Sequence, residues 1–439
     1  MNQSNGSRRR VAVTGLGVVC PLGLTKEAFW EKLIQGQSSV QANQNPSLPL
    51  PFTSVAESFT GAIDNFGEMA AEPKKAIRKG TKMMCRETQM GVAAAQRALH
   101  DAGWVLGMWD AQRCGVSFGA GYMVTEPGDM TDGMKKCLDE REQFDFDRWG
   151  TDGMRCVTPL WLLNYLPNMP ACHIAIYNDL RGPNNSLTQS EASANLAIGE
   201  AFHVIARGSA DLMVTGATGT KVNPTRAVHT ALQEEVARTG DDPAGVSRPF
   251  DQHRSGMVPG EGAGAVILEE WEAAKARNAT IYGEVIGTGS SCVASPRHIA
   301  RRKQALENAM RAALKCAGIG PDDVSFIHAH GLSTRSGDSE EAQAILSVFG
   351  PRASQLPVVA AKGNFGNLGA GSGAVELASA LLALHHGHLF PLFNYQTPDP
   401  SCPVSPVKSN DRESGDCFLS LNVNHRAQAS CLIVQRGKL

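Results

Sequence analysis

The stretch that decides the fold reads Gly182-Pro-Asn-Asn-Ser-Leu-Thr-Gln-Ser-Glu191-Ala-Ser-Ala-Asn-Leu-Ala-Ile-Gly199. Small and polar residues lead into apolar residues at helical spacing, and the pattern ends at Arg207-Gly208, which is typical of a strand or loop that leads into a helix. In an α/β protein such a turn presents one side chain at a helix N-terminus, where free N–H groups stabilise an anion. The side chain presented here is the carboxylate of Glu191.

This stretch resembles the active-site segment of the β-ketoacyl-acyl carrier protein synthases, the elongating ketosynthases of the thiolase fold. Gly182-Pro-Asn and the later Ile-Gly199 match the family pattern in register. The family has its nucleophilic cysteine where this chain has Glu191. The resemblance extends from Val11 to Val434, so the thiolase fold is expected for the chain even though the nucleophile differs.

The composition is that of a soluble globular protein. Of the 439 residues, 42% are hydrophobic and 19% are charged, and the formal net charge is -2. This charge gives no reason to expect nucleic acid or an anionic membrane as a partner. Eleven cysteines without C-x-x-C spacing indicate a reduced, cytoplasmic protein without a metal site. No stretch is long and apolar enough to span a bilayer, and no cofactor is expected.

One pattern of strands and helices occurs twice along the chain. It begins with a β-branched strand that runs into a glycine-rich turn, followed by an Ala-rich helix, a second strand, and a later helix that leads to a further strand. The matched segments are residues 10–23 with 281–290, 89–103 with 303–318, 114–121 with 324–331, 192–208 with 374–387, and 210–217 with 389–392. A pattern used twice predicts two similar halves packed against each other.

The duplication agrees with the α/β thiolase fold, which has five layers in the order αβαβα. We expect an N-terminal half over residues 1–270 and a C-terminal half over residues 271–439. Residues 121–170 lack a clear period, and the resemblance identifies them as a variable cap that shapes an acyl tunnel and a dimer contact.

The resemblance assigns four further residues to the active site. His330 corresponds to the first catalytic histidine and Lys362 to the lysine of the family pattern. Asn367 stands where elongating enzymes have a second histidine, and His425 falls at the position of a gating phenylalanine, in a loop without the family's glycines. His330 and Asn367 are predicted to donate hydrogen bonds to an enolate, whereas Glu191 cannot supply the thiolate that holds the acyl chain.

Several functions are compatible with Glu191. Thr188 precedes it by three residues, the spacing of a helix capping box worth about 0.5–2 kcal/mol.

The leading hypothesis for the whole protein is a non-condensing subunit of fatty acid or polyketide assembly. Such a subunit resembles the chain-length factors, pairs with an active ketosynthase and binds acyl carrier protein. The alternative without turnover is a homodimeric pseudoenzyme that holds an acyl chain or a carrier protein.

Two enzymatic alternatives stay open. In the first, the protein only decarboxylates malonyl-carrier protein. An ionised Glu191 about 5 Å from the malonyl carboxylate would repel that carboxylate by roughly 3 kcal/mol. Replacement of Glu191 by glutamine is therefore predicted to speed the release of carbon dioxide. In the second, Glu191 and His330 form an acid–base pair on an acyl thioester. That hypothesis predicts a carboxylate within hydrogen-bond reach of His330 or His425, directly or through one water.

Overall fold

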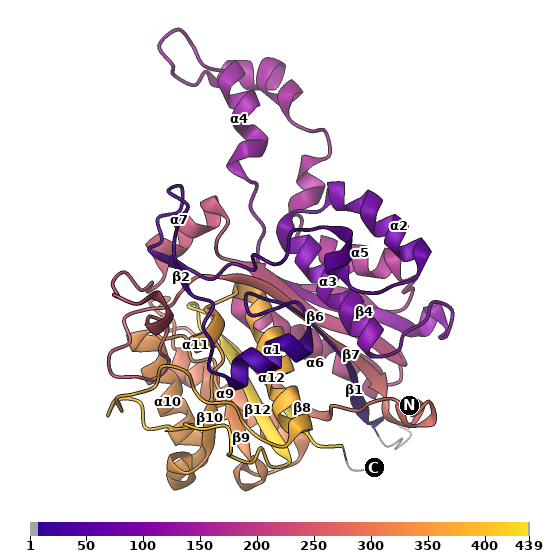
Figure 1. Ribbon diagram of the computed structural model, residues 1–439, viewed down its shortest axis with the longest axis vertical. Coiled ribbons are helices and arrows are strands. Elements are labelled where there is room, and N and C mark those ends of the chain that lie inside the picture. The colour runs from indigo at the N-terminus through magenta and orange to yellow at the C-terminus, as the bar shows by residue number, and fades with distance from the viewer. Residues whose placement is uncertain (1–7, 438–439) are drawn as a thin grey trace.

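The main β-sheet has two halves with the same strand pattern (Figure 1). It is seen in a computed structural model that describes residues 8–437. The strands of the first half are β1 (Val11–Val19), β4 (Cys114–Ala120), β5 (Asn184–Thr188), β6 (Leu212–Thr220) and β7 (Glu261–Glu270). Those of the second half are β8 (Gly283–Cys292), β9 (Phe326–His328), β10 (Pro357–Val359), β12 (Cys417–Val423) and β13 (Gln428–Gln435).

The pairing of these strands repeats as well. The first half has the order β5-β4-β6-β7-β1, and the second half has the order β10-β9-β12-β13-β8. In each half the first three strands are parallel, and the remaining pairings are antiparallel. The halves join where β1 pairs with β8 between Val11–Val13 and Gly283–Val285, and β11 (Ser405–Pro406) extends the far edge.

Helices form three layers around the two halves of the sheet. On the first half, α3 (Arg86–Asp101) and α5 (Met169–Tyr177) cover the outer face, whereas α9 (Arg302–Ala317), with α10 (Arg335–Phe349) beside it, covers the second half. Between the halves lie α6 (Ser193–Ala206) and α12 (Ser372–His386). Since α12 is buried almost throughout, the layer order is αβαβα, as predicted.

Two glycines show how closely the outer helices approach the sheet. A Cβ atom on Gly17 of β1 would lie 2.0 Å from the carbonyl oxygen of Ala94 in α3. A Cβ atom on Gly289 of β8 would lie 2.1 Å from the carbonyl oxygen of Ala309 in α9. Only glycine fits at both places. The two halves of the molecule therefore share the same close packing of an outer helix on a strand.

Residues 121–170 form an arm that stands out from the body at the top of Figure 1. It contains α4 (Pro127–Lys136) and several short 3₁₀ and π turns. Large apolar side chains are exposed along it: Met134, Leu138, Phe146, Met154, Leu160 and Leu162. Such a surface is typical of an interaction site.

Of the strands expected from the sequence, the opening one is found and a later one is not. β1 continues to Val19 with a bulge between Val13 and Gly15, and the chain then turns between Cys20 and Gly23. The predicted strand at residues 389–392 is absent, since the place beside β9 is taken by β12. The remaining elements of the body are α1 (Lys26–Ile34), β2 (Gln41–Ala42), β3 (Phe52–Thr53), α2 (Ala71–Gly80), α7 (Pro224–Gln233), α8 (Trp271–Ala276) and α11 (Lys362–Phe365).

Candidate active site

A tight turn between β5 and α6 presents Glu191 to the interior. Ser190, directly before it, has a φ of 49°, a left-handed conformation that is costly for a residue with a Cβ atom. The hydroxyl of Ser193 accepts a hydrogen bond from the backbone N–H of Gln189 at 2.7 Å and so ties the turn together. Glu191 itself is only 2% exposed.

The Glu191 carboxylate does not cap the helix, so the capping interpretation is wrong. Thr188 ends β5, and neither the 3₁₀ turn at residues 190–192 nor α6 has a side-chain cap. Instead, Oε1 of Glu191 lies 2.8 Å from Nζ of Lys221 and accepts a hydrogen bond from Nδ2 of Asn367 at 3.1 Å. Oε2 is buried and has no hydrogen-bond partner among residues 8–437.

Lys221 is the site residue that sequence reasoning missed. It directly follows β6, its side chain is 1% exposed, and its Nζ also lies 2.6 Å from Oε1 of Glu234. Burial disfavours the charged forms, but the opposite charges outweigh burial, so the pKa of Glu191 is lowered and the pKa of Lys221 is raised. The two shifts agree, and Glu191 is therefore an ionised carboxylate in a buried ion pair.

His330 lies after β9 against a second buried ion pair. The ammonium of Lys362 contacts a carboxylate oxygen of Glu376, and it lies 3.2 Å from Nδ1 of His330 and 2.8 Å from the His330 carbonyl oxygen. An ammonium has only donors, so Nδ1 accepts and the proton of the neutral ring is on Nε2. Burial and then Lys362 hold the pKa of His330 well below its usual value.

The neutral ring gives His330 a defined chemical role. Its Nε2 is buried and unpartnered within the described residues, so it offers one N–H donor. A ring with such a low pKa is a poor proton acceptor at neutral pH. This geometry fits hydrogen bonding to an oxyanion, the role that the sequence predicts for His330.

Asn367 is held in one orientation. Its Oδ1 accepts hydrogen bonds from the backbone N–H of Gly369 and from the hydroxyl of Ser372, both at 3.1 Å. Its Nδ2 therefore faces Glu191, and it also lies 3.2 Å from the sulfur of Met257. The donor that the sequence predicts for an enolate is thus already bonded to the carboxylate.

His425 lies in the loop between β12 and β13, and burial lowers its pKa. Together with His330, it lines a cavity of about 210 Å³ that also includes Glu234, Met257 and Asn424. No cysteine is among the described residues that line this cavity. Glu191 makes no direct hydrogen bond to either histidine within residues 8–437.

The structure thus brings together the five residues singled out from the sequence. Glu191 contacts Asn367, Lys362 contacts His330, and His330 shares a cavity with His425. Among residues 8–437, no group of three or more His, Cys, Asp or Glu side chains is placed to hold a metal ion. None of the helices described is both long and apolar enough for a membrane crossing.

The sequence of this chain matches a known protein family over most of its length. Residues 8–274 match the N-terminal domain of β-ketoacyl synthase, and residues 282–396 match its C-terminal domain. The chain is 33% identical over 412 residues to 3-oxoacyl-[acyl-carrier-protein] synthase 2 of Synechocystis, which covers 93% of both chains.

Two solved structures are similar over 98% of this chain and 100% of their own. One is AntDE:AntF, a type II PKS acyl-carrier protein in complex with its ketosynthase, with 25% identity and a TM-score of 0.81. The other is the ishigamide ketosynthase/chain length factor, with 25% identity and a TM-score of 0.80. These similarities confirm the predicted thiolase fold. The chain belongs to the β-ketoacyl synthase family.

Proposed function

We propose that the chain is a cytoplasmic, non-condensing ketosynthase-like subunit that pairs with a cysteine-containing ketosynthase, as a chain-length factor does. The observation that carries this proposal is the ion pair between Glu191 and Lys221, with atoms 2.8 Å apart, where the resemblance puts the nucleophile. A carboxylate held by an ammonium and an amide is a weak nucleophile. Any acyl anhydride that it formed would hydrolyse readily, so it would be a poor store for a growing chain.

The same ion pair makes the acid–base alternative less favourable. A general base works best when its pKa lies near the working pH, but Lys221 shifts the pKa of Glu191 downward. His330 is neutral, and its Nε2–H group is buried without a hydrogen-bond partner among residues 8–437. The site keeps a hydrogen-bond donor while its carboxylate is bound to Lys221, which suits a binding subunit better than a proton-transfer enzyme.

The exposed edge of the main sheet supports the proposal that this chain pairs with a second subunit. Among the described strands, β5 lies at the end of the main sheet and pairs with β4 only, and three of its five residues are exposed. An unpaired edge strand is a ready template for another strand. The apolar arm at residues 121–170 supports the same conclusion, because apolar side chains on an extended segment gain stability when a partner covers them.

A basic helix supports contact with an acidic acyl carrier protein. α2 carries four cationic side chains, and a further lysine follows it: Lys74, Lys75, Arg78, Lys79 and Lys82. Of these, Lys74 pairs with the exposed carboxylate of Asp64 at 3.2 Å. Clustered charge of one sign steers an oppositely charged protein and sets its orientation.

Co-expression with a cysteine-containing ketosynthase tests the proposal. Native mass spectrometry should show a one-to-one heterodimer, and condensation should require the cysteine of the partner. Phe146→Asp in the arm should weaken pairing, whereas Leu232→Asp on α7 should not, since the two side chains are matched in exposure at 82% and 79%. A homodimer of this chain that elongates an acyl thioester alone would overturn the proposal.

A further inference from the structure

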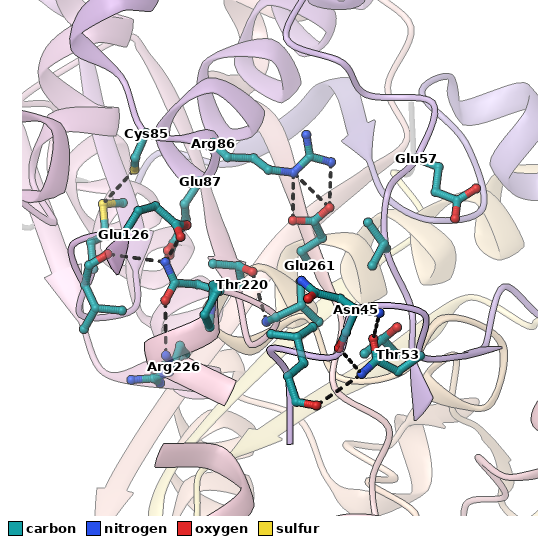
Figure 2. A pocket seen from close by; sticks show the side chains of 18 of the residues that line it. Asn45, Thr53, Glu57, Cys85, Arg86, Glu87, Glu126, Thr220, Arg226 and Glu261 are labelled. Carbon is teal, nitrogen blue, oxygen red and sulfur yellow. Dashed lines mark hydrogen bonds and ion pairs between the residues drawn. The ribbon is translucent and has the colours of Figure 1, made fainter. Parts of the chain in front are cut away.

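A second cavity, of about 340 Å³, lies between residues 41–57, the segment after β4 and the start of α7 (Figure 2). This volume is in the range of small-molecule sites. Thr220 and Val222 line it on either side of Lys221, so the cavity adjoins the site around Glu191 without including that residue. Its apolar wall consists of Leu48, Val55, Met123, Val124, Val222 and Pro224.

Most charged groups on the wall already have partners. The guanidinium of Arg86 bonds the Glu261 carboxylate, with the closest pair of atoms 2.6 Å apart. Glu126 accepts a hydrogen bond from Nδ2 of Asn223 at 2.6 Å. Glu57 is exposed, so water solvates its charge. The amide of Asn223 holds the Glu126 carboxylate in place, and the Arg86–Glu261 pair is neutral as a whole.

Arg226, in the first turn of α7, is different. The residue is only 8% exposed, and its guanidinium lies 4.2 Å above the centre of the Tyr122 ring. The Tyr122 hydroxyl is held in turn by Nδ1 of His229 at 2.6 Å. In the part of the chain that the structure describes, the guanidinium has neither an ion-pair partner nor a hydrogen-bond acceptor. The side chain is largely enclosed, but its nitrogen atoms are not sealed off from the cavity, so an anion in the cavity can reach the guanidinium and supply the missing counter-charge.

Glu87 does not supply that anion. It is 6% exposed, and Figure 2 shows it on the same side of the cavity as Arg226. Burial raises the pKa of Glu87 to about 8, although the charge of Arg226 opposes the shift. No ion pair joins Glu87 to Arg226 within residues 8–437, and a carboxyl whose pKa is raised by burial carries less negative charge near neutral pH than a free one.

We propose that this cavity binds an aliphatic carboxylate, with the carboxylate on Arg226 and the hydrocarbon chain against the apolar wall. The planar guanidinium matches a carboxylate with two parallel hydrogen bonds. The start of α7 adds positive potential on the same wall. The ligand is either a free carboxylic acid or the terminal carboxylate of a carrier-bound chain, and the site is independent of whether the chain pairs with a ketosynthase.

Calorimetric titration of the purified full-length protein with octanoate at pH 7 tests the site. We expect saturable binding that Arg226→Met weakens roughly tenfold or more, and that Arg226→Lys weakens less. Octanol, which lacks the charge, should bind more weakly than octanoate. Arg238→Gln is the matched control, because Arg238 is exposed, follows α7 and does not line the cavity. Equal binding by Arg226→Met, equal binding of octanol, or no binding of octanoate would overturn the proposal.

Thermal unfolding keeps the test independent of folding defects. Arg226→Met removes an unpaired buried charge, so its melting temperature without ligand should equal or exceed that of the wild type. Octanoate should raise the melting temperature of the wild type only. If Arg226→Met does not fold, the affinity of the Arg226→Lys variant for octanoate and the affinity of the wild type for octanol still test whether Arg226 binds the carboxylate. Octanedioyl-carrier protein binding more tightly than octanoyl-carrier protein would identify the carrier-bound source, and equal binding would identify the free acid.

Discussion

Lys221 holds one ammonium between the carboxylates of Glu191 and Glu234, so removal of the cation should cost more stability than removal of one acid. Lys221→Met leaves the buried carboxylate of Glu191 and the partly buried carboxylate of Glu234 without their counter-ion, for which we expect a loss of about 3–5 kcal/mol in the free energy of unfolding. Glu191→Gln keeps the shape and the pair between Lys221 and Glu234, so its loss should be smaller. Urea denaturation of the two variants measures the difference, and equal losses would show that the ion pair contributes little.

Glu191→Gln also tests the decarboxylation hypothesis. Malonyl-carrier protein brings a carboxylate toward Glu191, and Lys221 offsets part of the repulsion, so we expect the variant to release carbon dioxide about tenfold faster than the wild type. His330→Ala in the same background should abolish the gain, because the Nε2–H donor is lost. Equal or faster release by the wild type would contradict the electrostatic argument.

Glu87 makes stability fall as the pH rises. Its pKa is raised by burial from 4.5 to about 8, so between these values the folded state binds more protons than the unfolded state, and the free energy of unfolding decreases with increasing pH. Glu87→Gln should therefore be more stable than the wild type at pH 9 and close to it at pH 4. Melting curves at the two pH values check this, and a constant difference between the two proteins would exclude the titration of Glu87 as the cause.

At the scale of elements, α2 offers a test of carrier-protein contact. Lys75→Glu with Lys79→Glu reverses two exposed charges on one helix, and we expect the affinity for acyl carrier protein to fall about tenfold at low salt and less at high salt. Lys315→Glu in α9 is the control, because this exposed lysine belongs to the helix layer on the other half. A similar loss in the control would point to net charge rather than to a docking helix.

The elements also show how far the sequence predicts the structure. Helices such as α6 and α12 are found where their apolar spacing and terminal glycines predict them. The prediction of a strand at residues 389–392 is wrong because a short apolar run does not reveal its partner in the sheet. The place beside β9 is taken by β12 instead. Glu191, His330 and Asn367 were predicted from local motifs, whereas Lys221 was missed because a lysine after a strand is usually exposed, and its burial depends on acids distant in sequence.

At the scale of the whole molecule, the repeat was predictable because it is present in the order of elements. The continuity of the main sheet across the halves was not, since it rests on the short pairing of β1 with β8. The division of the chain between residues 270 and 271 stays a prediction. The arm at residues 121–170 lacked a period because little of it packs against the body, and side chains without a packed face leave no regular pattern.

The position of β1 has a consequence for synthesis on the ribosome. β1 is translated well before its two neighbours in the sheet, β7 and β8, which begin only at residues 261 and 283. The nascent chain must therefore keep an apolar strand unpaired while about 240 further residues are made, a state prone to aggregation. A nascent chain stalled before residue 261 should be bound by chaperones, and one stalled with β8 outside the exit tunnel should be released from them.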